Sequence, residues 1–369
     1  MSGSIHGGAF WSEVGNDMDR LASVVRADVL DAWFPPAPAV IAALREHSIE
    51  FCRTSPEADA GPLRAAISQA RGIPIQCVLT HGGSSALIFL ALPILAREAK
   101  TALILDPMYG EYRHVFEQLD EPPRVVALPL SRRESFRLDP ARLFDFPAEV
   151  VVIVNPNSPT GQHVASENLR PVVEELAKTR IVWIDETYIE YAGPGESLER
   201  VAAENRNVIV CKSMSKVYAL SGLRAAYLVA HPDRVAQLAP LRPPWAVSLP
   251  AQVCGAFALG EPEYYAGRYE ETAALRNCLR KSLEHRCFEI TDGVINSLLV
   301  HLPADGPSAS EVCMRAASRG IYLRDAGSMG ITMGTHTLRV AVRTSTENAR
   351  IADAIHQTLA ITPVSAHER

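Results

Sequence analysis

Two cations stand eight residues apart in the segment CKSMSKVYALSGLRAAY, residues 211–227. Lys216 follows Ser213 and Ser215, and Arg224 comes just before an apolar run. A solvated helix face would carry more charge than this segment, and a buried core segment would carry less. The pattern therefore indicates that both cations face a bound group. A lysine amine can form a Schiff base with an aldehyde, and an arginine can grip an anion.

Further polar groups follow apolar runs that are typical of buried strands. Asp185 ends RIVWID, and Tyr188 comes three residues after it. Asn157 and Ser158 follow the run EVVVIVN within the sequence NPNSPTG. Ligands of open parallel sheets bind at the carboxyl ends of the strands, so these four side chains are candidates for one site.

A glycine-rich turn offers a place for an anion. Gly83, Ser84 and Ser85 lie in VLTHGGSSALIF, where a strand pattern gives way to a helix pattern. Free N–H groups and the helix dipole attract an anion at such a position. By itself, however, such a turn is more often a plain helix cap, just as a lone lysine is usually solvated. The combination is more specific than any of its parts.

Together these groups match the needs of pyridoxal 5'-phosphate. Its phosphate binds N–H groups, hydroxyls and an arginine, and its aldehyde forms a Schiff base with a lysine. Its pyridinium nitrogen pairs with a carboxylate, which keeps the ring able to accept electrons. The sequence therefore predicts a cofactor site made of an anion cradle, a carboxylate, a phenol and Lys216.

The elements that must position this site alternate between apolar strands and helices. Such alternation is typical of a mostly parallel sheet covered on both faces, and right-handed crossovers would make residues 45–235 one α/β domain. Residues 251–285 indicate one or two long helices within a second, smaller α+β domain. The expected strands are 101–106, 124–128, 149–155, 180–185, 207–212, 225–230, 297–303, 321–325 and 337–343; the expected helices include 84–97, 111–119, 166–178 and 346–360.

Proline-rich turns at 240–250 suggest the boundary between the two domains. We expect an N-terminal arm over 1–40 that packs on the small domain or on a partner subunit. A large cofactor-binding domain would follow over 41–245, and a small C-terminal domain over 246–369.

Composition limits the function classes. The 369 residues suffice for about two domains, and a net charge of −6 implies no basic surface for nucleic acid. The seven cysteines form no CxxC pair, so we expect reduced cytoplasmic thiols and no metal site. The longest apolar stretch, 84–96, is too short to span a membrane and contains Pro93.

Four motifs in a fixed order carry a family resemblance over nearly the whole chain: NPNSPTG, DETY, SMSK and GLR. The chain resembles the fold-type-I pyridoxal-phosphate enzymes of the class I/II aminotransferase superfamily. This resemblance implies the aspartate aminotransferase-like fold of PLP-dependent transferases, with a mostly parallel large domain and a smaller α+β domain. It also implies a homodimer.

The resemblance assigns roles to individual residues. Lys216 would form the Schiff base and carry a proton, Asp185 would pair with the pyridinium nitrogen, and Tyr188 would hydrogen-bond the ring 3-oxygen. Tyr109 would stack on the pyridine face. The implied cofactor-binding residues are Gly83, Ser84, Ser85, Tyr109, Asn157, Ser158, Asp185, Tyr188, Ser213, Lys216 and Arg224.

Within the superfamily the chain resembles histidinol-phosphate aminotransferases and threonine-phosphate decarboxylases. Segments that support this include HGG (6–8), LRD (323–325) and LRVAVRT (338–344). Arg324 and Arg339 correspond to two arginines that grip substrate anions. Arg343 stands where the aminotransferase pattern has glycine, and it would be either a third substrate cation or a surface ion pair.

Two positions depart from the family pattern. Ser158 stands where asparagine usually precedes Pro-Thr-Gly, so either Ser158 or Asn157 would contact the ring 3-oxygen. Thr54 and Ser55 stand where the histidinol-phosphate branch has Arg-Tyr-Pro, whose tyrosine reaches the cofactor of the neighbouring subunit.

Three functions remain open from the sequence. Transamination of a small anionic amino acid or amino-phosphate is favoured, because it is the commoner activity of this assembly. The alternative is a lyase, such as a threonine-phosphate-type decarboxylase or a specialised elimination or cyclisation enzyme. Arginine placement would decide between them, because the bond aligned with the cofactor's π system breaks. A PLP-sensing regulator would need a DNA-binding module, and no basic patch or helix-turn-helix is visible.

Overall fold

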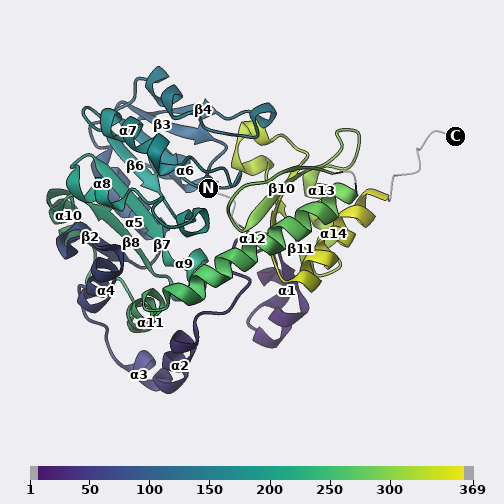
Figure 1. Ribbon diagram of the computed structural model, residues 1–369, viewed down its shortest axis with the longest axis horizontal. Helices are drawn as coiled ribbons and strands as arrows, with labels where there is room; N and C mark the ends of the chain where they lie inside the picture. The colour runs from purple at the N-terminus through teal and green to yellow at the C-terminus, as the bar shows by residue number, and fades with distance from the viewer. Residues whose placement is uncertain (1–6, 287, 361–369) are drawn as a thin grey trace.

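The computed structural model describes residues 7–286 and 288–360. Its larger part is built on a seven-stranded sheet, and its smaller part on a four-stranded and a two-stranded sheet (Figure 1). His6 of the HGG segment, Cys287 and the far ends of the two terminal segments lie outside the described residues. The six cysteines within them are free.

The large sheet has the strand order β2-β8-β7-β6-β5-β3-β4. Every neighbouring pair is parallel except the two pairs that include β8. The prediction of a mostly parallel sheet is therefore confirmed. The strands are β2 (Val78–His81), β3 (Thr101–Asp106), β4 (Arg124–Pro129), β5 (Val150–Val154), β6 (Ile181–Asp185), β7 (Val208–Ser213) and β8 (Ala226–Ala230).

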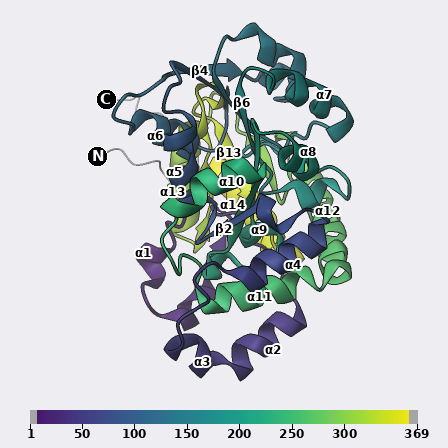
Figure 2. The same ribbon diagram turned by 90° about the vertical axis from the view of Figure 1, so that its left-hand side faces the viewer.

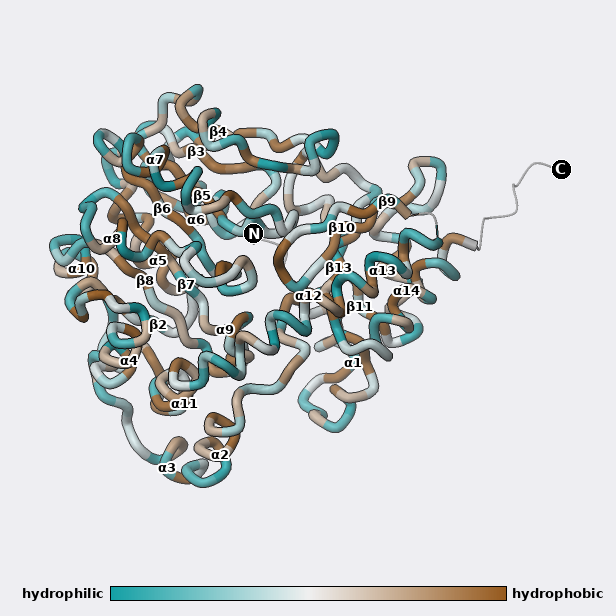
Figure 3. The backbone as a smooth tube through the Cα atoms, viewed as in Figure 1, coloured by the Kyte–Doolittle hydropathy of each residue, from teal (hydrophilic) through white to brown (hydrophobic). Residues whose placement is uncertain are grey.

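Helices cover both faces of the large sheet. Figure 2 shows α5 and α6 on one side of the strands and α7 and α8 on the other. The central strands are therefore buried on both faces, which explains their near-continuous apolar sequences (Figure 3). The helices of this part are α2 (Pro38–Glu46), α3 (Ser48–Arg53), α4 (Gly61–Arg71), α5 (Ser84–Leu95), α6 (Glu111–Glu117), α7 (Ser166–Leu176), α8 (Glu199–Glu204), α9 (Met214–Val217) and α10 (Pro232–Leu238).

The predicted helical region 251–285 forms two helices, α11 (Leu249–Leu259) and α12 (Pro262–His285). The break falls at Gly260, and Pro262 starts the second helix, where its missing N–H costs nothing. Cys254 and Ala258 of α11 belong to the core of the large part, where α11 packs on α2 and α4. The change from one core to the other therefore falls later in the chain than the expected boundary at 245.

The smaller part has an antiparallel sheet in the order β12-β13-β10-β9. The expected single strand 321–325 is divided, because Ile321–Tyr322 pairs with the arm and Arg324–Asp325 pairs with β13. Two helices complete this part. Its elements are β9 (Glu289–Thr291), β10 (Ser297–His301), β11 (Ile321–Tyr322), β12 (Arg324–Asp325), β13 (Thr337–Ala341), α13 (Ala309–Ala317) and α14 (Ser345–Ala360).

The amino-terminal segment joins the small part. Its strand β1 (Val25–Arg26) pairs in parallel with β11, and its helix α1 (Trp11–Val14) lies near β11 (Figure 1). Phe10 and Val14 pack with Val24 and Tyr322 in a small apolar cluster. Among the described residues, no helix combines the length and apolarity needed to cross a bilayer.

Candidate functional site

The candidate site lies at the edge of the large sheet where β5, β6 and β7 end. Strand β8 runs antiparallel to β7, so its first residue, Ala226, pairs with the last residue of β7, Ser213. Lys216 follows β7 and Arg224 precedes β8 in the one connection between these two strands, so both cations reach the same edge. The topology thus brings together cations that are eight residues apart in sequence.

Lys216 lies in the short helix α9 and ends in an ion pair. Its Nζ is 2.6 Å from Oδ1 of Asp31, and both side chains are partly exposed. Burial opposes ionisation of Asp31, but the Lys216 ammonium outweighs it and holds the pKa of this carboxyl below its usual range. Asp31 was not anticipated from the sequence, where it is one carboxylate among apolar arm residues.

Asp185 is buried at the end of β6 and is held from two sides. Its Oδ2 accepts a hydrogen bond from the Tyr112 hydroxyl at 2.7 Å, and its Oδ1 accepts one from the Thr187 N–H at 2.9 Å. Burial raises the pKa of Asp185, and these hydrogen bonds partly offset the rise. Each carboxylate oxygen can still accept another donor, so a protonated ring nitrogen would suit this group.

Tyr112 is a second residue that the sequence did not reveal. Its hydroxyl accepts a hydrogen bond from Trp183 Nε1 at 3.0 Å and passes one to Asp185, which fixes the carboxylate's orientation. Its ring centroid lies 6.2 Å from that of Tyr109, but Tyr109 precedes α6, so no helical spacing in the sequence marked Tyr112.

The turn before α5 approaches Arg224 closely. A Cβ on Gly83 would lie 2.6 Å from Arg224 Nη2, and the φ of Gly83 is +109°, so this position excludes a side chain. Arg224 Nη1 also donates to Ser215 Oγ at 3.3 Å, and the Ser215 N–H donates to Ser213 Oγ at 3.3 Å. Bare backbone, an arginine and hydroxyls therefore meet where α5 begins at Ser84, as in an anion cradle.

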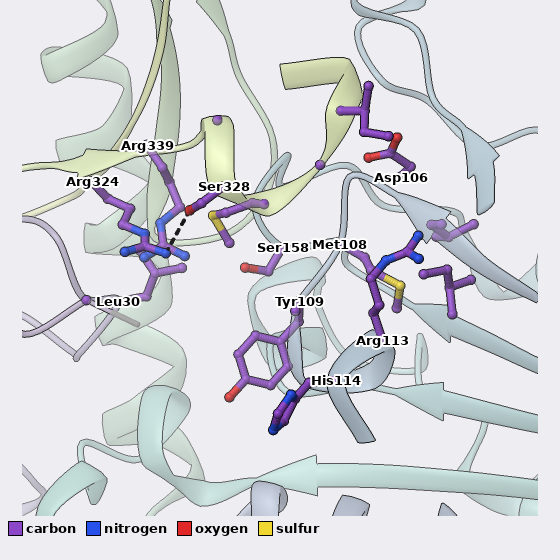
Figure 4. Close-up of a pocket in the computed structure, with 18 of the residues that line it drawn as sticks. Leu30, Asp106, Met108, Tyr109, Arg113, His114, Ser158, Arg324, Ser328 and Arg339 are labelled. Carbon is purple, nitrogen blue, oxygen red and sulfur yellow. Dashed lines mark hydrogen bonds between the residues drawn. The ribbon is translucent and has the colours of Figure 1, made fainter. Parts of the chain in front are cut away.

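Tyr109 lies in the middle of the pocket (Figure 4). Its hydroxyl is 3.4 Å from Ser85 Oγ. Burial raises the pKa of Tyr109 to about 12, so its phenol is neutral at physiological pH. Tyr188 is also buried and lines the same pocket, and burial raises the pKa of its phenol too.

The structure separates the two candidates for the ring 3-oxygen. Ser158 lines the pocket. Asn157 is buried behind it, where its Nδ2 donates to the Pro107 carbonyl at 3.0 Å. Its Oδ1 has no hydrogen-bond partner among the described residues, which leaves one acceptor for a bound group or water.

Arg324 and Arg339 lie side by side at one end of the pocket (Figure 4). Arg324 Nη2 donates to Ser328 Oγ at 3.1 Å, and Arg339 Nη2 donates to the Asp28 carbonyl at 2.9 Å. Burial, and after it the neighbouring Arg324, lowers the pKa of Arg339 to about 10, while Tyr188 opposes this shift. Both groups stay cationic at neutral pH, and an anion between them would relieve their repulsion.

Arg343, expected either as a third substrate cation or as a surface ion pair, is not among the pocket-lining residues. Only 4% of it is exposed, which does not fit a surface pair. Its Nη1 donates to the Asp31 carbonyl at 3.1 Å. Arg343 therefore supports the arm behind the pocket.

The pocket itself is a cavity of about 680 Å³ between the two parts of the molecule. Its lining also includes Arg113, His114 and Glu117 of α6, together with Met329 and Ile331. These residues carry no motif, and the sequence did not single them out. Among the described residues, no group of three His, Cys, Asp or Glu side chains is placed to hold a metal ion.

The residues at this edge fit pyridoxal 5'-phosphate. Gly83 brings bare backbone close to the Arg224 guanidinium, Asp185 is a buried carboxylate, and Lys216 is a partly exposed amine. When bound, this cofactor supplies an electron sink for the substrate carbon that loses a group.

The chain matches known proteins over nearly its full length. Residues 29–355 match the model of the family "Aminotransferase class I and II". Histidinol-phosphate aminotransferase 1 of Nostoc sp. is 28% identical over 345 residues, which cover 94% of each chain. The chain therefore belongs to the class I and II aminotransferases, a family of pyridoxal-phosphate-dependent enzymes, as its motifs predict.

Solved structures share the fold at lower identity. The histidinol-phosphate aminotransferase of Sinorhizobium meliloti, in complex with pyridoxal-5'-phosphate, has a TM-score of 0.83 at 20% identity and covers 97% of this chain and 95% of that one. The L-threonine-O-3-phosphate decarboxylase of Porphyromonas gingivalis has a TM-score of 0.80 at 19% identity, with coverages of 91% and 100%. The predicted fold is confirmed by these similarities.

Proposed function

We propose that this enzyme transfers the amino group of a small anionic amino acid or amino-phosphate, in the manner of histidinol-phosphate aminotransferase. The observation that carries the proposal is the pair of guanidinium groups, Arg324 and Arg339, in the pocket that Lys216 also lines. Two adjacent guanidinium forks suit a substrate with an α-carboxylate and a second anionic group.

In this proposal Lys216 holds the cofactor covalently and moves a proton at the substrate's α-carbon. Asp185 keeps the cofactor's ring nitrogen protonated, and Tyr188 with Ser158 binds the ring 3-oxygen. Tyr109 stacks on the ring. The phosphate is held by the turn Gly83–Ser85, by Ser213 and by Arg224.

A substrate screen tests the proposal. The protein, loaded with pyridoxal phosphate, is incubated with histidinol phosphate or with acidic amino acids in the presence of 2-oxoglutarate, and glutamate is measured. We expect glutamate from at least one doubly anionic donor, and a fall of about a hundredfold in kcat/KM for Arg339→Ala, because a buried charge-assisted contact is lost. Carbon dioxide release from threonine phosphate without glutamate would replace transamination by the lyase function.

We also propose a homodimer. Three large apolar side chains of the large part are exposed: Ile49 of α3, Leu241 and Trp245, with 67%, 54% and 57% of their surface exposed. The Trp245 N–H donates to the Ala58 carbonyl, so Trp245 lies against the loop that follows α3. Covering these side chains in a dimer would remove apolar area from water. Sedimentation of the loaded protein should give a dimer, and a fully active monomer would contradict the proposal.

A further inference from the structure

We propose that Asp31 is the positioning residue for the reactive lysine of this chain. Its carboxylate would hold the Lys216 amine, in its protonated form, whenever that amine is not covalently linked to the cofactor. The inference rests on the proposed role of Lys216 and adds a residue to it. Two observations support it: the contact between Lys216 and Asp31, and the hydrogen bonds that fix the arm segment carrying Asp31.

The contact is short and lies within the pocket region. Lys216 Nζ and Asp31 Oδ1 are 2.6 Å apart, a charge-assisted hydrogen bond. The partners are 185 positions apart in sequence, so the fold alone brings them together. About a quarter of each side chain is exposed, 25% for Lys216 and 29% for Asp31, so the pair contributes little to stability. Its geometry is better explained by a role in the site.

The arm segment that carries Asp31 is fixed to the small part at its start. The Ala341 N–H of β13 donates to the Ala27 carbonyl at 3.0 Å. Arg339 Nη2 donates to the Asp28 carbonyl at 2.9 Å, and Arg339 is buried. Burying a guanidinium group costs free energy, and the hydrogen bond to the Asp28 carbonyl offsets part of that cost. This hydrogen bond fixes the stretch of arm in position.

The same segment is fixed at its end by two more buried side chains. Asn296 Nδ2 donates to the Leu30 carbonyl at 3.0 Å, and Arg343 Nη1 donates to the Asp31 carbonyl at 3.1 Å. Asn296 is completely buried, and 4% of Arg343 is exposed. Three side chains of the small part thus donate to the arm carbonyls of residues 28, 30 and 31, and the segment they hold carries the carboxylate that contacts the lysine of the large part.

The charges around Asp31 keep it ionised. Lys216 contacts its carboxylate, and Arg26 and Arg343 are the other cations that act on it. An ionised Asp31 can hold an ammonium group but cannot donate a proton. Lys216 Nζ is therefore the donor in this contact.

Arg339 links this arrangement to substrate binding. The proposed substrate arginine is the residue that also holds the Asp28 carbonyl, three positions before Asp31. A substrate anion that binds Arg339 would therefore contact the side chain that also holds the arm segment carrying Asp31. This connects the anion-binding end of the pocket to its amine-binding end.

The test measures the reactivity of Lys216 in the full-length protein before cofactor is added. Formaldehyde with cyanoborohydride methylates only unprotonated amines, and peptide mass spectrometry reports each lysine separately. In Asp31→Asn we expect Lys216 to react about tenfold faster at neutral pH, because its amine is no longer held in a charge-assisted hydrogen bond. Lys281 serves as the internal reference. Asp19→Asn, which removes an exposed carboxylate from the same arm, should leave the Lys216 rate unchanged.

A second measurement uses the loaded enzyme. Asp31→Asn should lower kcat by about tenfold with little change in KM, and Asp31→Glu should recover part of the loss, because the carboxylate acts on the lysine and not on substrate affinity. Thermal unfolding checks that each variant folds, and Asp31→Ser provides a second carboxylate-free variant.

The two measurements separate this inference from the proposed function. Equal methylation rates at Lys216 in wild type and both carboxylate-free variants would overturn the role of Asp31, whatever the enzyme's activity. If instead the wild type fails to link pyridoxal phosphate at Lys216, the proposed function fails, and the methylation rates still report on the ion pair.

Discussion

Two lysines four residues apart, one on a strand and one in the helix that follows it, occupy opposite environments. Lys212 of β7 is buried among three carboxylates, with its Nζ 2.7 Å from Glu190, 3.7 Å from Glu199 and 3.9 Å from Glu186. Lys216 of α9 is partly exposed, lines the pocket and contacts only Asp31 among the ion pairs that the described residues form.

Two neighbouring carboxylates, Asp185 and Glu186, also occupy different environments. Asp185 and Glu186 are neighbours at the end of β6, and consecutive strand residues point to opposite faces of a sheet. Asp185 accepts a hydrogen bond from Tyr112 of α6, whereas Glu186 accepts hydrogen bonds from Ser197 and from the Leu198 N–H. The sheet thus separates a closed ionic cluster that holds the fold from an open set of polar groups that can bind a ligand.

The largest expected effect is on chemistry, from Lys216→Ala. Removing the amine takes away both the covalent anchor and the proton carrier, so kcat should fall by about a thousandfold or more. The free energy of unfolding should change by less than about 1 kcal/mol, because the lost ion pair is partly exposed. Steady-state kinetics and denaturant unfolding measure the two. A loss of stability comparable to that of Lys212→Ala would contradict the distinction.

Lys212→Ala should show the reverse pattern. It leaves three carboxylates facing each other with only Arg71 to balance them, so the free energy of unfolding should fall by about 3 to 5 kcal/mol. Urea unfolding of the variant provides the measurement, with Lys281→Ala as a surface control. A variant as stable as wild type would show that the cluster is not what holds this side of the sheet.

Asp185→Asn tests the open side of the sheet at one atom. The amide keeps the side chain's size but cannot hold a proton on the cofactor's ring nitrogen, so kcat should fall by about a hundredfold. Thermal stability should be nearly unchanged. Near-normal turnover of this variant would show that Asp185 is not the residue that pairs with the cofactor's ring nitrogen.

Gly83→Ala should have a smaller effect, confined to cofactor binding. The new methyl group would lie 2.6 Å from Arg224 Nη2 in a backbone conformation that favours glycine, so Arg224 must move. We expect the Kd for pyridoxal phosphate to rise about tenfold, measured by fluorescence titration. Gly222→Ala is the control, because a Cβ there meets nothing within 4 Å. Equal affinities in the two variants would remove Gly83 from the phosphate site.

The last expected effect is a pH dependence of stability from the closed cluster. Burial, opposed by Lys212 and assisted by Glu199, raises the pKa of Glu186 from 4.5 to about 7. Between these values the folded state binds more protons than the unfolded state, so this group's contribution to stability falls as pH rises from 4.5 to 7. Unfolding curves across this range should show that slope, and Glu186→Gln should reduce it. An unchanged slope in the Glu186→Gln variant would show that another group titrates in this pH range.

The sequence predicted those parts of the fold and site that depend on local patterns. Apolar runs marked the large-sheet strands, and the motifs marked Lys216 and Asp185. Asp31 could not be found in this way, because its meeting with Lys216 depends on how the arm is held by side chains of the small part. The division of 321–325 between two sheets was missed for the same reason, since strand partners are set by tertiary packing.

The central claim is that Lys216, and no other lysine, carries the cofactor. The chain has five lysines, at positions 100, 178, 212, 216 and 281, so the claim can be tested at every one of them. Purified protein is incubated with pyridoxal phosphate, reduced with borohydride, digested and mapped by mass spectrometry. We predict a single pyridoxyl modification, on Lys216. A modification on Lys212 or another lysine, or none at all, would contradict the account.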